Sequence, residues 1–146
     1  ADESDGSFLH LTPAIAVITN IDPEHLDHYG DLAGVKKAFV DFANRVPFYG
    51  VVVACLDHPN VQDLLPQIDK RIATYGLAAQ ADYRARNPEM KGLSVSFEVI
   101  RRGESLGRFE VSMPGMHSVM NALATIAVAD ELRQAEAMVT LGRRRL

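Results

Sequence analysis

The sequence is poor in cysteine and lacks any long apolar run. Cys55 is the single cysteine among 146 residues, so no disulfide can form within the chain, and a reducing compartment is expected. No apolar stretch approaches the ~20 residues that a membrane-spanning helix needs. These two absences favour a cytoplasmic globular protein without a membrane span.

Excess positive charge and a targeting segment are missing as well. The net charge is −4, which argues against a nucleic-acid-binding surface over the whole molecule. The first residues, Ala-Asp-Glu-Ser-Asp, include no methionine and no basic-then-apolar signal peptide. The chain is therefore expected to be part of a longer protein.

The motifs that most directly indicate nucleotide or zinc chemistry do not occur. The phosphate-binding pattern G-x-x-x-x-G-K-[ST] is absent, and so are HExxH and paired Cys-x-x-Cys. The sequence therefore contains no recognisable phosphate cradle, and it offers little support for a zinc site.

The apolar residues that are present alternate between strand and helix patterns. Short β-branched runs predict buried parallel strands at 14–18 and 51–56, and apolar residues at three- and four-residue spacing predict a helix over 31–45. A short helix is expected after Pro59, and a third strand over 71–75. This alternation indicates an α/β fold with a mainly parallel sheet flanked by helices.

The pattern changes in the second half of the chain. Residues 93–99 and 109–113 alternate apolar and polar side chains around a turn at 102–104, which predicts an antiparallel hairpin and hence a small antiparallel sheet. An alanine-rich helix is predicted over 119–132. It is apolar around its circumference, so we expect it to lie against the sheet.

One candidate site follows the first predicted strand. The side chains there are carboxylates and imidazoles: Asp22, Glu24, His25, Asp27 and His28. Ligands of open α/β sheets bind beyond the carboxyl ends of the strands, and carboxylate and imidazole groups can hold magnesium or manganese. The alternative is a solvated turn with helix-capping roles.

A second candidate site is the Pro-Gly turn that precedes the last helix. Residues 115–121 deliver His117, Ser118 and Asn121 to a helix N-terminus, where a nucleotide is compatible because such ends favour anions. Ser118 could be the N-cap and Asn121 could face a ligand. The alternative is a capped, buried helix with a histidine packed beneath it.

Several motifs, taken together, resemble the central domain of the Mur ligases in order and spacing. The matching stretches are 1–9, 19–27, 46–50, 74–76 and 115–124. The resemblance covers residues 1–132 and implies the ATP-binding domain of this family, with 133–146 as a C-terminal helix or the start of a hinge. The Asp-Glu-Ser-Asp and Pro-Phe-Tyr-Gly elements favour the branch that joins L-alanine to UDP-N-acetylmuramate.

The resemblance implies a three-domain cytoplasmic ligase of peptidoglycan biosynthesis, in which ATP and Mg²⁺ convert a carboxylate into an acyl phosphate that an amine attacks. It makes His25 a catalytic residue and a magnesium ligand, and Asn121 an adenine contact, with His117 and Ser118 in the same nucleotide-binding motif. Glu3 is the nearest counterpart of the family's second metal ligand. UDP-N-acetylmuramate and L-alanine would bind mostly to other domains.

Ser118 stands where the family often has asparagine, and the family's phosphate-binding loop should lie before residue 1. The chain alone is therefore expected to be inactive. The other hypothesis is a binding or scaffold module that keeps the fold without catalysis.

Overall fold

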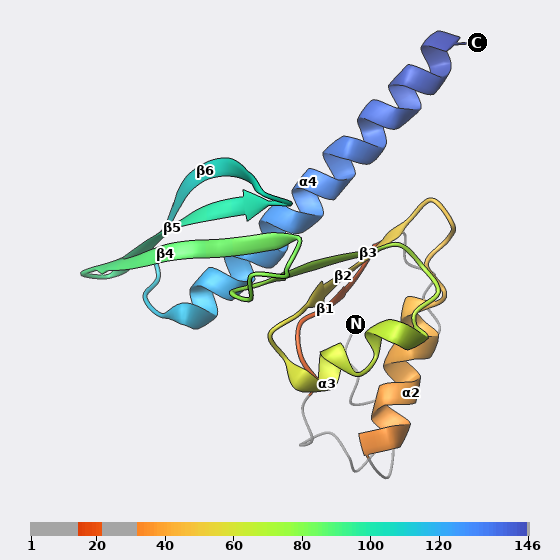
Figure 1. Ribbon diagram of the computed structural model, residues 1–146, viewed down its shortest axis with the longest axis horizontal. Helices are drawn as coiled ribbons and strands as arrows, with labels where there is room; N and C mark the ends of the chain where they lie inside the picture. Colours follow the sequence, from red (N-terminus) through yellow and green to blue (C-terminus); the bar gives the residue numbers. More distant parts are fainter. Residues whose placement is uncertain (1–14, 22–31, 146) are drawn as a thin grey trace.

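The computed structural model of the protein describes residues 15–21 and 32–145. These residues form a six-stranded sheet in the order β1-β2-β3-β4-β5-β6 (Figure 1). Its strands are β1 (Ile15–Ile18), β2 (Val51–Cys55), β3 (Ile72–Gly76), β4 (Tyr83–Lys91), β5 (Ser94–Arg101) and β6 (Glu104–Val111). The helices are α2 (Leu32–Ala43), α3 (Pro59–Gln62) and α4 (Met116–Arg145), with a short 3-10 turn at Leu65–Gln67.

The first three strands confirm the predicted parallel sheet. β1 pairs with β2, and β2 pairs with β3, in parallel register. All five residues of β2 are buried, as expected for a central parallel strand whose two faces are covered, and this burial explains its uninterrupted apolar sequence.

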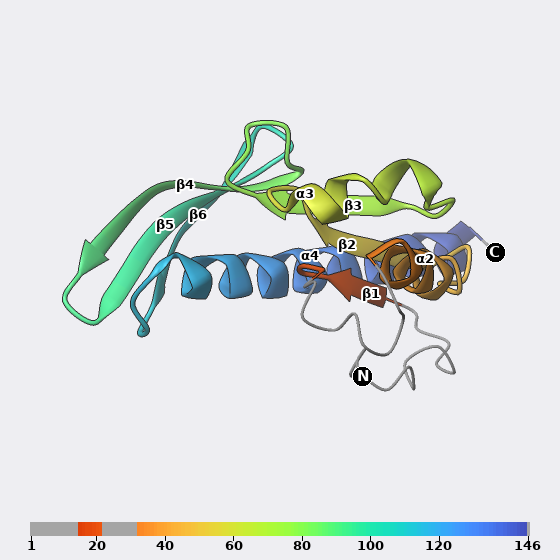
Figure 2. The same ribbon diagram turned by 90° about the horizontal axis from the view of Figure 1, so that it is seen from below.

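Alternate residues of β2 belong to two separate cores. Val53 packs in the cluster that contains Leu123 and Ala127 of α4. Val52 packs in the cluster that contains Val35 of α2 and Val61 of α3. Because successive side chains of a strand point to opposite faces, α4 covers one face of the sheet, while α2 and α3 cover the other (Figure 1; turned by 90° in Figure 2).

Strand β4 is the element that the sequence pattern does not predict. Its sequence contains Asn87 and Pro88, which are residues typical of turns. In the structure Asn87 has a φ of 51°. In the structure a β-bulge absorbs the two residues, which is the usual place for proline within a strand. Tyr83 at the start of β4 pairs in parallel with Tyr75 at the end of β3, and the strand then pairs antiparallel with β5, so β4 joins the parallel and antiparallel parts of the sheet.

The predicted hairpin is present as β5 and β6, which meet at a turn where Arg102 and Gly103 both have positive φ. These antiparallel strands continue the same sheet and do not form a separate one. α4 begins at Met116 and continues beyond the predicted end near residue 132 to Arg145. Among the described residues, no helix is long and apolar enough to span a membrane.

Candidate functional site

The first predicted site, at the end of β1, lies largely outside the described residues. This is the case for Glu3 and His25, so their assignment as metal ligands stays a prediction. The structure does describe how the chain leaves β1: Ile21 is buried, and its carbonyl oxygen accepts a hydrogen bond of 3.3 Å from Nδ2 of Asn60 in α3. In the described part of the chain, no three His, Cys, Asp or Glu side chains are close enough to hold a metal ion.

The second predicted site forms a hollow of about 240 Å³ between the end of β6 and the first turns of α4. It is lined by Val111, Met113, His117, Ser118, Asn121, Ala122 and Thr125. The three predicted residues of α4 are therefore brought together, because positions three and four apart share one face of a helix.

Ser118 does not have the predicted role of N-cap. α4 begins two residues earlier, at Met116, and the hydroxyl of Ser118 donates a hydrogen bond of 3.1 Å to the carbonyl oxygen of Pro114. Gly115, which precedes the helix, has a φ of 97° and so makes the sharp turn that this entry to the helix requires.

The hollow can accept a flat ring with polar edges. Val111, Met113 and Ala122 supply apolar wall, and Met113 is 64% exposed. Asn121 is exposed, and no described residue forms a hydrogen bond with its side-chain amide. Since an amide offers both a donor and an acceptor, it can bind the edge of a heteroaromatic base lying against the apolar wall.

The sequence does not predict the buried ionic network where α4 crosses β4 and β5. Asp130 is 7% and Glu131 2% exposed. The groups that donate hydrogen bonds to them come from three strands or their ends and from α4 itself: Arg71, Tyr83, Arg101, Arg102, Arg133 and Gln134. The sequence feature that could have indicated this network is the pair of adjacent acids, Asp130 and Glu131, in a helix predicted to be apolar and buried. Buried carboxylates require hydrogen-bonding partners.

This network shifts the pKa values of its members in opposite directions. Burial raises the pKa of Tyr83, and its hydrogen bond to Asp130 raises the pKa further. Burial alone would raise the pKa of Asp130, but hydrogen bonds from Tyr83, Arg101 and neighbouring donors outweigh it and hold the pKa well below its usual range. Tyr83 therefore stays a donor and Asp130 a charged acceptor at neutral pH.

A close backbone approach occurs where β2 and β3 end. The carboxylate of Asp57 accepts hydrogen bonds from the backbone N–H groups of Leu77, at 2.6 Å, and Ala78, at 3.1 Å. A Cβ atom on Gly76 would lie 2.6 Å from Oδ1 of Asp57. There is therefore no room for a side chain at position 76. The Asp57 carboxylate links the carboxyl ends of β2 and β3.

Residues 2–129 match the model of the Mur ligase middle domain. The chain belongs to this family, as the motifs predicted. It is 67% identical over 132 residues to the UDP-N-acetylmuramate--L-alanine ligase of Sorangium cellulosum (strain So ce56), and 62% identical over 132 residues to that of Myxococcus xanthus (strain DK1622). Each match covers 90% of this chain and 28% of the relative.

The fold agrees with this membership. The solved UDP-N-acetylmuramate-alanine ligase of Thermotoga maritima superposes with a TM-score of 0.75 at 27% identity, over 90% of this chain and 28% of that one. The predicted fold class is therefore confirmed. The chain spans little more than a quarter of the length of these relatives.

Proposed function

We propose that this chain is the ATP-binding middle domain of an enzyme that joins L-alanine to UDP-N-acetylmuramate in peptidoglycan biosynthesis. The observation that carries the proposal is the 67% identity over 132 residues to a ligase with that name. The hollow at the start of α4, which contains Asn121, supports it. UDP-N-acetylmuramate and L-alanine would be bound mainly by parts of the ligase outside this chain.

Within this proposal, the hollow at the start of α4 binds the adenine of ATP. Asn121 hydrogen-bonds to the base edge, and Met113 packs on the ring face. His117 and Ser118 lie in the first turn of the helix, on the side that lines the hollow. A heteroaromatic base suits such a site, because a few polar groups placed on an apolar surface fix the orientation of a ligand.

The metal part of the proposal rests on His25, with Glu3 as second ligand. Imidazole and carboxylate are both donors that magnesium accepts. The ion would neutralise phosphate charge while the acyl phosphate forms. The hydrogen bond from Asn60 to the carbonyl oxygen of Ile21 holds Ile21, four residues before His25, next to α3.

Calorimetry on residues 1–146 tests the adenine site. Adenosine should bind weakly, and Asn121→Ala should weaken binding by about ten-fold, the effect of losing one or two hydrogen bonds to a ligand. Ser112→Ala, next to the hollow but outside its lining, is the matched control and should have no effect. Equal binding of adenosine by the chain and by Asn121→Ala would refute the assignment.

ATP with magnesium should bind this chain no more than a few-fold more tightly than adenosine, because the sequence has no phosphate-binding loop. Affinity for ATP a thousand-fold above that for adenosine would show that the chain holds the phosphates without that loop. The expectation that the missing loop limits ATP binding would then be wrong.

A further inference from the structure

A second hollow, larger than the first, lies further along α4. Its volume is about 380 Å³, within the range of small-molecule sites. It is lined by Leu106, Phe109, Ile126, Ala129, Asp130 and Arg133. None of these residues lines the hollow that contains Asn121, so it is a distinct site that the proposed function does not use.

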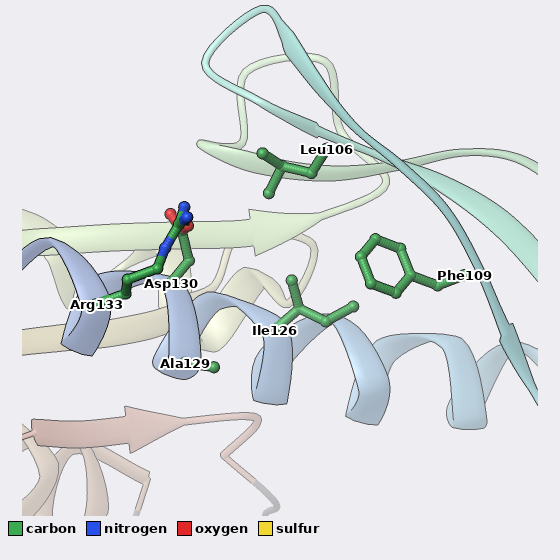
Figure 3. Close-up of a pocket in the computed structure, with 6 residues that line it drawn as sticks. All are labelled: Leu106, Phe109, Ile126, Ala129, Asp130 and Arg133. Carbon is green, nitrogen blue, oxygen red and sulfur yellow. The ribbon is translucent and has the colours of Figure 1, made fainter.

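The walls of this hollow are apolar and held in place by the sheet. Leu106 and Phe109 extend from β6, while Ile126 approaches from α4 (Figure 3). The ring of Phe109 stacks on that of the fully buried Phe97, with 6.3 Å between the ring centres. An apolar ligand would therefore meet a preformed surface, which lowers the entropic cost of binding.

One end of the hollow carries an oriented positive group. Arg133 donates a hydrogen bond of 2.7 Å to Oδ1 of Asp130, and Figure 3 shows the two side chains next to each other. The Arg133 side chain is 71% exposed, whereas that of Asp130 is 6% exposed. The buried carboxylate thus holds the guanidinium at the edge of the hollow, where most of the Arg133 side chain stays exposed.

Asp130 itself has no capacity left for a ligand. Its two oxygens accept hydrogen bonds from Tyr83, Arg101, Arg133 and Gln134, which saturates the approximately four lone-pair sites of a carboxylate. The polar group that a ligand meets at this end is therefore a guanidinium, which binds anions such as carboxylates in a bidentate manner.

We infer that the hollow between β6 and α4 is a binding site for a small amphipathic anion, an aromatic or branched apolar body that carries one carboxylate. The apolar body lies against Phe109 and Ile126, and the carboxylate pairs with Arg133. The site goes beyond the proposed function and does not depend on it, because neither ATP nor the residues around Asn121 take part.

Methyl NMR on residues 1–146 with 2-naphthoate as the probe tests the inference. The methyl resonances of Leu106 and Ile126 should shift in a saturable manner, with a Kd of roughly 1 mM for a ligand of this size. Arg133→Gln should weaken binding by about ten-fold, the effect of losing a charge-assisted hydrogen bond. Ala129→Met, which fills the hollow with a good helix former, should abolish the shifts.

Two controls distinguish binding at this site from nonspecific binding. Arg84→Gln removes a guanidinium that is bonded to the carbonyl of Leu77, outside the hollow, and it should leave the affinity unchanged. The neutral analogue 2-naphthamide should bind about ten-fold more weakly than 2-naphthoate. Equal affinity for the two probes, or unchanged binding of 2-naphthoate by Arg133→Gln, would refute an anion site. The absence of saturable shifts at Leu106 and Ile126 would refute the site altogether.

Discussion

The hydroxyl of Tyr83 donates a hydrogen bond of 2.5 Å to Oδ2 of Asp130, and this bond joins β4 to α4. The two residues are 47 positions apart in the sequence, and both are buried. Arg102 also lies over the Tyr83 ring, 5.8 Å from its centre. This hydrogen bond therefore holds β4 against α4, the helix that carries the proposed adenine site.

Replacing Tyr83 with phenylalanine should destabilise the protein by about 1.5–3 kcal/mol, because it removes a buried hydrogen bond to a charged group. Urea unfolding measures this loss. Tyr49→Phe is the control, since Tyr49 is 68% exposed, and it should change the free energy of unfolding by less than about 0.5 kcal/mol. Similar losses in the two variants would contradict the role given to the Tyr83 hydroxyl.

Asp130→Asn should destabilise the protein by about 1–3 kcal/mol at pH 7, because the charge-assisted hydrogen bonds from Arg101, whose side chain is 20% exposed, and from the exposed Arg133 lose their charged acceptor. The pKa of Asp130 is lower in the folded protein than in the unfolded chain. Its contribution is therefore fully present above the unfolded pKa of about 4 and is lost as the pH falls towards the folded pKa.

Urea unfolding of the wild type and of Asp130→Asn between pH 3 and pH 8 tests the direction of this pH dependence. The stability difference between the wild type and Asp130→Asn should be constant from about pH 6 to pH 8 and should narrow below about pH 4. A difference that widens as the pH falls would mean that the carboxylate is not held charged by its neighbours.

The sequence predicts those elements whose patterns are local. β2 is evident from five successive apolar residues, and the hairpin of β5 and β6 from its alternation of apolar and polar residues. β4 is not, because Asn87 and Pro88 resemble a turn until pairing with β5 on one side and β3 on the other holds the strand in the sheet.

The same distinction applies to the sites. Asn121 and His117 share a helical face that spacing reveals, so their proximity was predictable. The partners of Asp130 come from distant parts of the chain, and only folding makes them neighbours. Whether Ser118 is the N-cap was left open by the sequence, which does not fix the first residue of the helix; the structure begins α4 at Met116 and so excludes that role.

Gly76→Ala should destabilise the protein by about 1–3 kcal/mol, because its Cβ would overlap the Asp57 carboxylate. A double-mutant cycle with Asp57→Ala isolates this contact. In the Asp57→Ala background, Gly76→Ala should lower the free energy of unfolding by at least about 1 kcal/mol less than it does in the wild type. The effects of substitutions at two residues in contact are not additive. An additive cycle, measured by urea unfolding, would show that the close approach is not the reason for glycine.

The central claim is that this domain serves an ATP-dependent ligase. The most direct measurement uses a chimaera in which residues 1–132 replace the matching 28% of the Sorangium cellulosum ligase. The chimaera should join L-alanine to UDP-N-acetylmuramate with stoichiometric hydrolysis of ATP to ADP, and His25→Ala should lower kcat by at least about a hundred-fold. A folded chimaera without this activity, or one equally active after His25→Ala, would contradict the account.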